Sequence, residues 1–340
     1  MIKNNGCNWQ RKKLPEVTKY SYLCHLFHII WHYNTIPFHP KNHKKGISNM
    51  NNIWSKQIQG AKTLYYSRKL RFNDMFKDRY KPAFALDENK PLKILEIGCG
   101  PGALAGALHR WYPKAEIAAI DRDSDLIEFA SAHEKGIVFA EGDATNLSFA
   151  DETFDVVISN TVCEHIDPEK FFGEQKRVLK NGGVCLVLSS RRGINSAGEQ
   201  EISEFEQVFW EKVEKYDNTI SKHSVGKYAM SESELPKTME KYGFSDVQTD
   251  FAIIPLTPDD PKFSAELAHD IINSDRYSSI ERLESILYTF PERFTEEEVE
   301  EMKRIVNNRY DERIGSYDRG EKAWDTQAGV SMIVRGIKSR

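Results

Sequence analysis

Hydrophobic residues follow a regular alternation of helical and strand-like runs from residue 53 onward. Residues 53–80 have helical apolar spacing and few breakers, which predicts one or two helices. The aliphatic run 93–97 stops at a glycine and predicts a buried strand, followed by a helix at 103–111. The same patterns predict strands at 116–120, 137–140, 154–159 and 184–189 and helices at 124–133 and 169–179. Strands that alternate with helices predict βαβ units, hence an α/β fold with a doubly wound parallel sheet.

Composition narrows the class of protein. The chain has 340 residues, of which 40% are hydrophobic and 29% charged, as in an ordinary globular protein. Residues 1–49 are basic, with Glu16 as their only acid, so the rest of the chain is more acidic than its net charge of −4 indicates. An acidic body argues against binding nucleic acid. The five cysteines form no CxxC pair, which fits a reducing, cytoplasmic location, and no metal site is expected.

The first 49 residues do not follow the pattern of the rest. The run 20–38 lacks full charges but is interrupted by histidines, an asparagine and Pro37, so no membrane span is expected. We interpret 1–49 as a dispensable extension before Met50 and expect 50–340 to form the functional domain.

A glycine-rich turn supplies the first candidate chemistry. Residues Gly98–Gly102 follow the first strand and open a helix, an arrangement that brings backbone N–H groups close to a ligand. Gly98, Gly100 and Ala103 also satisfy the dinucleotide fingerprint, and Asp121, 21 residues beyond Gly100, stands where a ribose-binding acid is expected in either case.

Two carboxylates favour a ligand with a methionine moiety over a dinucleotide. Glu96 ends the first strand, where its charge would repel a pyrophosphate but attract the ammonium group of a methionine moiety. Asp143 follows the third strand and is suited to an adenine amino group. A nicotinamide oxidoreductase remains the alternative that these two residues disfavour.

The chain resembles the class I S-adenosylmethionine (SAM)-dependent methyltransferases, in particular the small-molecule type 11 group that includes ubiquinone and menaquinone methyltransferases. The resemblance covers about 91–190 and is carried by LEIGCGPG (95–102), IAAIDRD (117–123), EGDATNLSFADETFDVVISN (141–160), CEHI (163–166) and RVLKNGGVCLVLS (177–189). It implies SAM as cofactor and a small organic methyl acceptor.

The resemblance also implies roles for individual residues. Glu96 and the glycine turn would hold the methionine moiety, Asp121 the ribose hydroxyls, and Asp143 with the backbone of Ala144 the adenine. The cofactor-binding residues it implies are Glu96, Gly98, Cys99, Gly100, Gly102, Asp121, Arg122, Asp143, Ala144 and Asn160.

The family topology implies a Rossmann-like, seven-stranded sheet of order 3-2-1-4-5-7-6 with strand 7 antiparallel. Residues 231–242 read as a helix, 244–256 as the sixth strand and 328–337 as the seventh. The core would therefore comprise 91–190, 228–256 and 328–338, with helical insertions at 198–222 and 257–327. We expect the insertions to cap the substrate; covering a sheet edge or forming a dimer contact is nearly as well supported for 257–327.

The acceptor site is the least determined part. The insertions bring aromatic and apolar residues, and a cap of this kind would suit a compact, partly apolar organic acceptor: Phe205, Phe209, Tyr277, Leu283, Leu287 and Tyr288. His165, after the fourth strand, is the candidate catalytic residue, with a structural role as the competing interpretation. The sequence thus predicts a cytoplasmic SAM-dependent methyltransferase, monomeric or homodimeric; a non-catalytic SAM-binding module is a further alternative.

Overall fold

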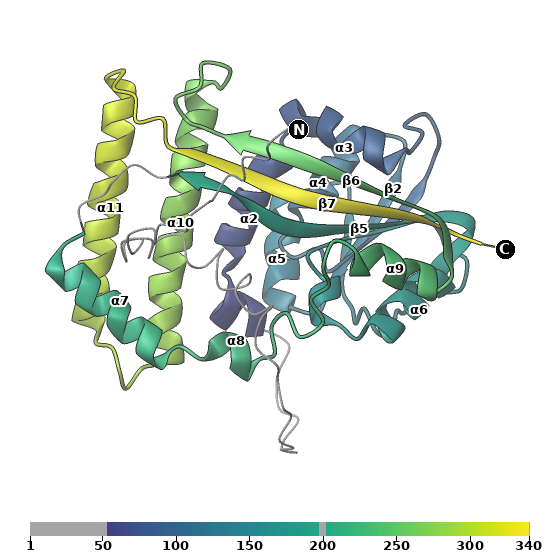
Figure 1. Cartoon of the computed structure of the whole chain (residues 1–340), viewed down its shortest axis with the longest axis horizontal. Coiled ribbons are helices and arrows are strands. Elements are labelled where there is room, and N and C mark those ends of the chain that lie inside the picture. The colour runs from purple at the N-terminus through teal and green to yellow at the C-terminus, as the bar shows by residue number, and fades with distance from the viewer. Residues whose placement is uncertain (1–52, 197–201, 340) are drawn as a thin grey trace, which may run out of the picture.

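A computed structural model describes residues 53–196 and 202–339. The interpretation of 1–49 as a dispensable extension therefore lies outside the described residues. A seven-stranded sheet of order β3-β2-β1-β4-β5-β7-β6 organises the described part of the chain (Figure 1), which confirms the predicted topology. Its strands are β1 Lys93–Ile97, β2 Glu116–Asp121, β3 Val138–Glu141, β4 Phe154–Asn160, β5 Leu179–Ser196, β6 Phe244–Leu256 and β7 Thr326–Lys338. The pairs from β3 to β5 are parallel, whereas β7 runs antiparallel to both β5 and β6.

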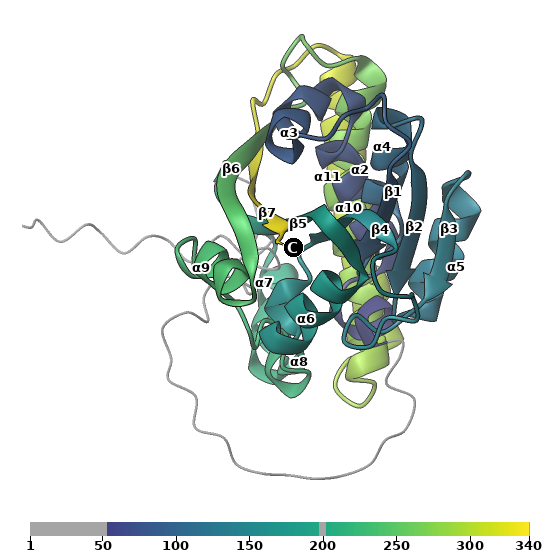
Figure 2. The same cartoon turned by 90° about the vertical axis from the view of Figure 1, so that its right-hand side faces the viewer.

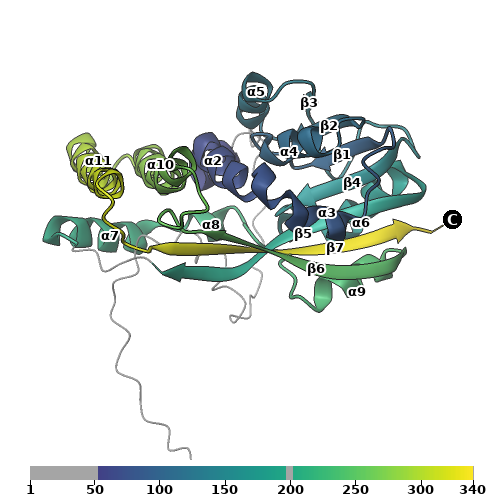
Figure 3. The same ribbon diagram turned by 90° about the horizontal axis from the view of Figure 1, so that it is seen from above.

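Helices cover both faces of this sheet. Alternate side chains of a strand point to opposite faces, so Ile94 of β1 packs in one hydrophobic cluster and Leu95 in another. The helices of the sheet domain are α2 Ala61–Arg71, α3 Lys77–Phe84, α4 Ala103–Trp111, α5 Ser124–His133, α6 Pro168–Val178 and α9 Glu234–Lys241. The first cluster takes side chains from α3 and α4, and the second from α6 and α9, so α9 lies on the opposite side of the sheet from α3 (Figures 2 and 3).

The segment 53–80 forms more elements than predicted. A π-helical turn, η3 (Trp54–Ile58), precedes α2, and a short 3₁₀ turn, η4 (Asp74–Phe76), leads into α3. The break between η3 and α2 falls at Gly60, which takes an extended backbone conformation. The apolar spacing alone does not reveal this break.

Strand β5 is longer than the sequence pattern predicts. β5 was predicted to end at Ser189 but continues to Ser196, because residues 194–196 pair with the beginning of β7. A bulge between Arg191 and Ile194 accompanies this extension, and a β-carbon at Gly193 would lie 2.0 Å from the carbonyl oxygen of Ala328. The hydrogen-bonding partner is distant in sequence, so the polar run 190–196 did not predict a strand.

The two insertions are helical and pack on one another. The first contains α7 (Glu204–Tyr216) and α8 (Thr219–Lys222), and the second contains α10 (Ala265–Thr289) and α11 (Glu296–Asp318) between β6 and β7. They share a third hydrophobic cluster, in which Phe209 and Val213 of α7 meet Leu283 of α10 and Val299 of α11. Figure 3 shows α2, α10 and α11 side by side above the long strands. The insertions thus build a helical layer that reaches the N-terminal helix.

Among the described residues, no helix has both the length and the apolar character needed to cross a bilayer.

Candidate active site

The Gly98–Gly102 turn joins β1 to α4 in a conformation that favours glycine. Gly98, Gly100 and Gly102 have φ angles of +67°, +55° and +87°, in the left-handed region. A β-carbon at Gly98 would also lie 2.4 Å from Cγ2 of Val162. Cys99, between Gly98 and Gly100, is buried, and its amide donates a hydrogen bond to the carbonyl oxygen of Ile120. The turn therefore presents backbone rather than side chains at the carboxyl end of β1.

Asp121 ties the turn to the end of β2. Its Oδ2 accepts a hydrogen bond from the amide of Gly100 at 2.8 Å, and its Oδ1 accepts from the amide of Asp123 at 3.0 Å. Burial raises the pKa of Asp121, against the lowering effect of these two bonds. Arg122 follows with an exposed side chain. Asp121 thus stands at the expected place, partly engaged in holding the turn.

Glu96 is a carboxyl group buried below the turn, with 1% exposure. Burial raises its pKa to about 8; Arg68 and a hydrogen bond from the amide of Ala105 act in the opposite direction. Its Oε2 has no hydrogen-bond partner. A buried acceptor without a donor is costly, and a cationic or N–H-bearing ligand group would satisfy it.

Asp143 and Ala144 lie in the loop after β3. Asp143 is exposed and its Oδ1 accepts from the amide and the hydroxyl of Thr145, both at 2.8 Å. These two bonds close a short turn at the start of the loop.

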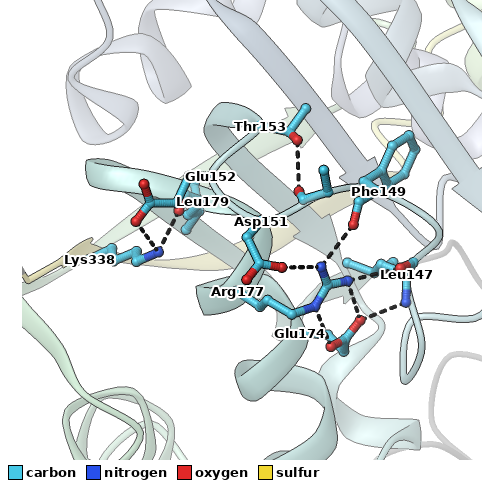
Figure 4. A network of polar contacts seen from close by, with 10 residues as sticks. Leu147, Phe149, Asp151, Glu152, Thr153, Glu174, Arg177, Leu179 and Lys338 are labelled. Carbon is cyan, nitrogen blue, oxygen red and sulfur yellow. Dashed lines mark hydrogen bonds and ion pairs between the residues drawn. The ribbon is translucent and has the colours of Figure 1, made fainter.

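Arg177 of α6 holds the continuation of that loop (Figure 4). Its guanidinium donates to the carbonyl oxygens of Leu147 and Phe149, each at 2.8 Å, and pairs with Asp151 and Glu174. Glu174 in turn accepts from the amide of Leu147 at 2.7 Å. Charge-assisted bonds of this kind fix the path of the backbone that carries Asp143.

The end of β4 contributes Asn160, which is 3% exposed, and the residues that follow it. Glu164 binds the hydroxyl of Ser189, at the end of the neighbouring strand. Nδ1 of His165 accepts a hydrogen bond from the amide of Gly226 at 2.9 Å, and the ring packs edge-on against Trp54.

This geometry bears on the role proposed for His165. Because Nδ1 accepts a backbone hydrogen bond, the neutral ring carries its proton on Nε2 and is a donor there. Burial lowers the pKa of His165, which also favours the neutral ring. The arrangement supports the structural interpretation over that of a general base.

A cavity of about 660 Å³ lies beside these elements. It is bounded by η3 and the start of α2, by Thr161, Glu164 and His165 after β4, and by α10. Of the six aromatic and apolar residues of the insertions named above, Tyr288 lines this cavity. The others lie elsewhere: Phe209, Leu283 and Leu287 pack in the helical cluster, Tyr277 packs on Tyr66, and Phe205 is exposed.

Arg68 of α2 stands between the cavity and the glycine turn, and sequence analysis did not identify it. Its Nη2 donates to Oγ1 of Thr161 at 3.1 Å, and a β-carbon at Gly100 would lie 2.9 Å from its Nη1. Burial lowers the pKa of Arg68, and the negative charges of Glu96 and Asp121 act against this lowering. The available signal was the pair Arg68 and Arg71, three residues apart on one face of the predicted helix.

The fold therefore gathers Glu96, the glycine turn, Asp121 and Asn160 near Arg68, whereas Asp143 and Ala144 lie further along the same edge, after β3. Among the described residues, no group of three or more histidine, cysteine, aspartate or glutamate side chains is arranged to hold a metal ion.

Comparison with known proteins agrees with this description. The family described as "Methyltransferase domain" matches residues 95–187. A malonyl-[acyl-carrier protein] O-methyltransferase of Hahella chejuensis is 35% identical over 106 residues, which cover 30% of this chain and 38% of that protein. A fatty-acid O-methyltransferase of Mycolicibacterium smegmatis is 37% identical over 103 residues, 29% of this chain and 37% of that protein. The matched part thus spans less than half the length of these two curated relatives.

A solved structure of phosphoethanolamine N-methyltransferase 2 from Haemonchus contortus, in complex with S-adenosyl-L-methionine, aligns with 88% of this chain and 62% of that one. Its sequence identity is 17% and its TM-score 0.47.

The sheet order and the glycine turn are those that the sequence resemblance implies. Residues 95–187 of this chain match the family described as "Methyltransferase domain".

Proposed function

We propose that this protein transfers a methyl group from SAM to a small organic acceptor. The observation that carries the proposal is Arg68, which lines a cavity large enough for a small molecule and also lies beside the glycine turn, Glu96 and Asp121. Residues 50–340 would form the methyltransferase unit, with the two helical insertions as its cap.

The described residues fit the cofactor in chemical type. Glu96 offers an unpaired acceptor to the ammonium group, and Arg68 a cation to the carboxylate of the methionine moiety. Asp121 would bind the ribose hydroxyls, and Asp143 with the backbone of Ala144 the adenine. The turn Gly98–Gly102, which includes Cys99, would form the walls of the cofactor site together with Arg122 and Asn160.

The cofactor supplies a methyl group on a sulfonium that is already a reactive donor, so the protein's main task is to position the acceptor and exclude water. The cavity beside Thr161 and His165 is where we place the acceptor. With its neutral ring, His165 would orient the acceptor or hold the loop at Gly226. We further propose a cytoplasmic location, with a monomer or homodimer as the working unit.

Calorimetric titration tests the cofactor assignment. We expect SAM and S-adenosylhomocysteine to bind and NAD not to bind. Asp121→Ala and Asp143→Ala should each weaken SAM binding about tenfold or more, because each loses charge-assisted hydrogen bonds. Glu128→Ala, an exposed carboxylate on α5, is the matched control. Unchanged affinity in both site variants would remove the assignment.

Transfer is tested separately by incubating the protein with isotopically labelled SAM and a fractionated metabolite extract, followed by mass spectrometry. A labelled small product is the expected result. SAM binding without transfer to any fraction would instead favour the non-catalytic SAM-binding module.

A further inference from the structure

Arg71 of α2 is a partly buried cation that pairs with no carboxylate among the described residues. Its hydrogen bond within the described chain is from Nε to the carbonyl of Ser67, at 3.3 Å. Its aliphatic stem lies over β7, where a β-carbon at Gly329 would be 3.4 Å from its Cδ. Burial, and the nearby charge of Arg68, lower its pKa to about 10. Burying a charge is costly unless it is paired, so the position of Arg71 calls for an explanation.

The other enclosed arginines nearby are all paired with carboxylates. Arg191 contacts Glu232, Arg282 contacts Asp217, Arg309 contacts Glu206, and Arg313 contacts Asp259 and Asp325. Arg68 has Glu96 and Asp121 beside it. Among the described arginines that line a cavity and are not exposed, Arg71 therefore differs from the others in having no carboxylate beside it.

Three carboxylates that line a cavity together with Arg71 are engaged elsewhere. Glu281 accepts from the amides of Lys62 and Thr63, and Glu164 binds Ser189. Asp275 accepts from Gln327, and burial raises its pKa to about 7, so it is only partly ionised at neutral pH.

Arg71 also occupies a particular place between two cavities. It lines both the cavity of about 660 Å³ and a second one of about 250 Å³, together with Thr63, Ser190, Arg191 and Ser278. Part of the lining of the larger cavity is apolar or aromatic, from Trp54, Ile58, Leu64, Met230 and Tyr288. A molecule in it would have a carbon skeleton against these side chains and one end against a guanidinium.

We propose that Arg71 binds a carboxylate of the methyl acceptor, so that the substrate is an organic acid with an apolar part. This inference rests on the proposed function, which places the acceptor in the larger cavity. A guanidinium matches a carboxylate in shape and can donate two parallel hydrogen bonds to it. One uncompensated positive charge balances a monoanion, whereas a phosphate dianion would leave one charge unbalanced.

The test is calorimetric titration of the full chain, saturated with S-adenosylhomocysteine, with three six-carbon probes: hexanoate, hexanamide and hexyl phosphate. We expect hexanoate to bind more tightly than the other two. Arg71→Gln should weaken hexanoate binding about ten- to hundredfold, the range of a charge-assisted pair, and Arg71→Lys should weaken it less. Lys69→Gln removes a cation from the same helix on its exposed side and should leave binding unchanged.

Several outcomes would overturn the proposal. These are no hexanoate binding to the wild type, hexanamide binding as tightly as hexanoate, or hexanoate affinity within twofold of wild type in both Arg71 variants. Tighter binding of hexyl phosphate would overturn the carboxylate in favour of a phosphate.

Two further readouts separate a binding role from a structural one. Removing an unpaired enclosed charge should not lower the melting temperature, so a large drop in Arg71→Gln would identify a structural residue and count against the proposal. Failure of S-adenosylhomocysteine to bind the wild type would instead remove the proposed function, and hexanoate titrated alone would then still report on Arg71.

Discussion

Glu96 is a carboxyl group that is buried in the folded protein. Its pKa of about 8 in the folded protein compares with 4.5 for an ordinary glutamate. The folded state therefore holds its proton more tightly than the unfolded state, and the stability that Glu96 contributes is lost as the pH rises from 4.5 through about 8.

We expect Glu96→Gln to remove that pH dependence. Above pH 8 the variant should be more stable than the wild type by about 1–3 kcal/mol, because it buries no charge. It should also bind SAM less tightly. Melting temperatures measured between pH 5 and 9 check this, with exposed Glu128→Gln as control. Parallel curves for wild type and Glu96→Gln would show that Glu96 does not titrate in this range.

His165 can be assigned by comparing two substitutions. His165→Ala removes the acceptor for the amide of Gly226, so it should cost about 1–3 kcal/mol of folding free energy. The side-chain oxygen of Asn can accept in place of Nδ1, so His165→Asn should keep most of the stability and transfer activity. The measurements are urea unfolding and single-turnover methyl transfer. A loss of about 10²–10⁴-fold in rate in both variants would instead identify His165 as a general base.

At the scale of elements, α2 depends on an insertion for its own N-terminus. Gly60, its N-cap residue, has no side chain to accept from the first amides of the helix. Glu281 of α10 takes this place by accepting from the amides of Lys62 and Thr63, at 3.1 and 2.8 Å. A carboxylate there also interacts favourably with the helix dipole. The helix that carries Arg68 and Arg71 is thus positioned by residues more than 200 positions away.

This helix cap predicts that substitutions at Glu281 and Gly60 have non-additive effects on the free energy of unfolding. Glu281→Ala should cost about 1–2 kcal/mol, as the loss of a helix cap does. Gly60→Ala should also destabilise, because its β-carbon would lie 2.3 Å from Cδ of Glu281. In the double variant that clash is absent, so the combined loss should be smaller than the sum.

Denaturant unfolding of the three variants measures this coupling. Glu284→Ala on the same helix, which breaks only a surface ion pair with Lys303, is the control and should change little. Strict additivity would show that Glu281 moves away from Gly60 without cost.

At the scale of the whole molecule, enclosed ion pairs join the two insertions, among them the pair of Asp217 with Arg282. Asp217, after α7, pairs with Arg282 of α10, and their side chains are 14% and 9% exposed. Burial disfavours the charged form of Asp217, but Arg282 and hydrogen bonds from Thr219 outweigh it and lower the pKa. The stability that this pair contributes is therefore fully present above pH 3.8, the ordinary value, and is lost as the pH falls below it.

Asp217→Asn should cost about 3 kcal/mol at neutral pH, because it leaves the guanidinium of Arg282 enclosed without its partner. The difference from wild type should shrink as the pH falls below 3.8, because the unfolded chain then takes up a proton on Asp217 more readily than the folded protein does. Urea unfolding at pH 7 and at pH 3 measures both effects. Glu300→Gln, in a surface pair with Lys303, should have little effect at either pH. A loss of the same size at both pH values would contradict the ion-pair account.

The sequence by itself determined the parts of the protein that local pattern specifies. The alternation of strands and helices, the glycine turn, and the acids Glu96 and Asp121 at strand ends could all be predicted, because the carboxyl ends of parallel strands meet at one edge of a sheet. The order of the strands was implied by the resemblance to a known family, and the structure confirms it.

The tertiary structure decided what depends on partners far apart in the chain. Residues 190–196 form a strand because β7 lies beside them, and His165 finds its partner in Gly226, 61 residues away. Arg68 and Arg71 reach the site because α10 caps α2. Such contacts leave no periodic signal in the sequence, since hydrogen bonds and burial between distant segments exist only once the chain has folded.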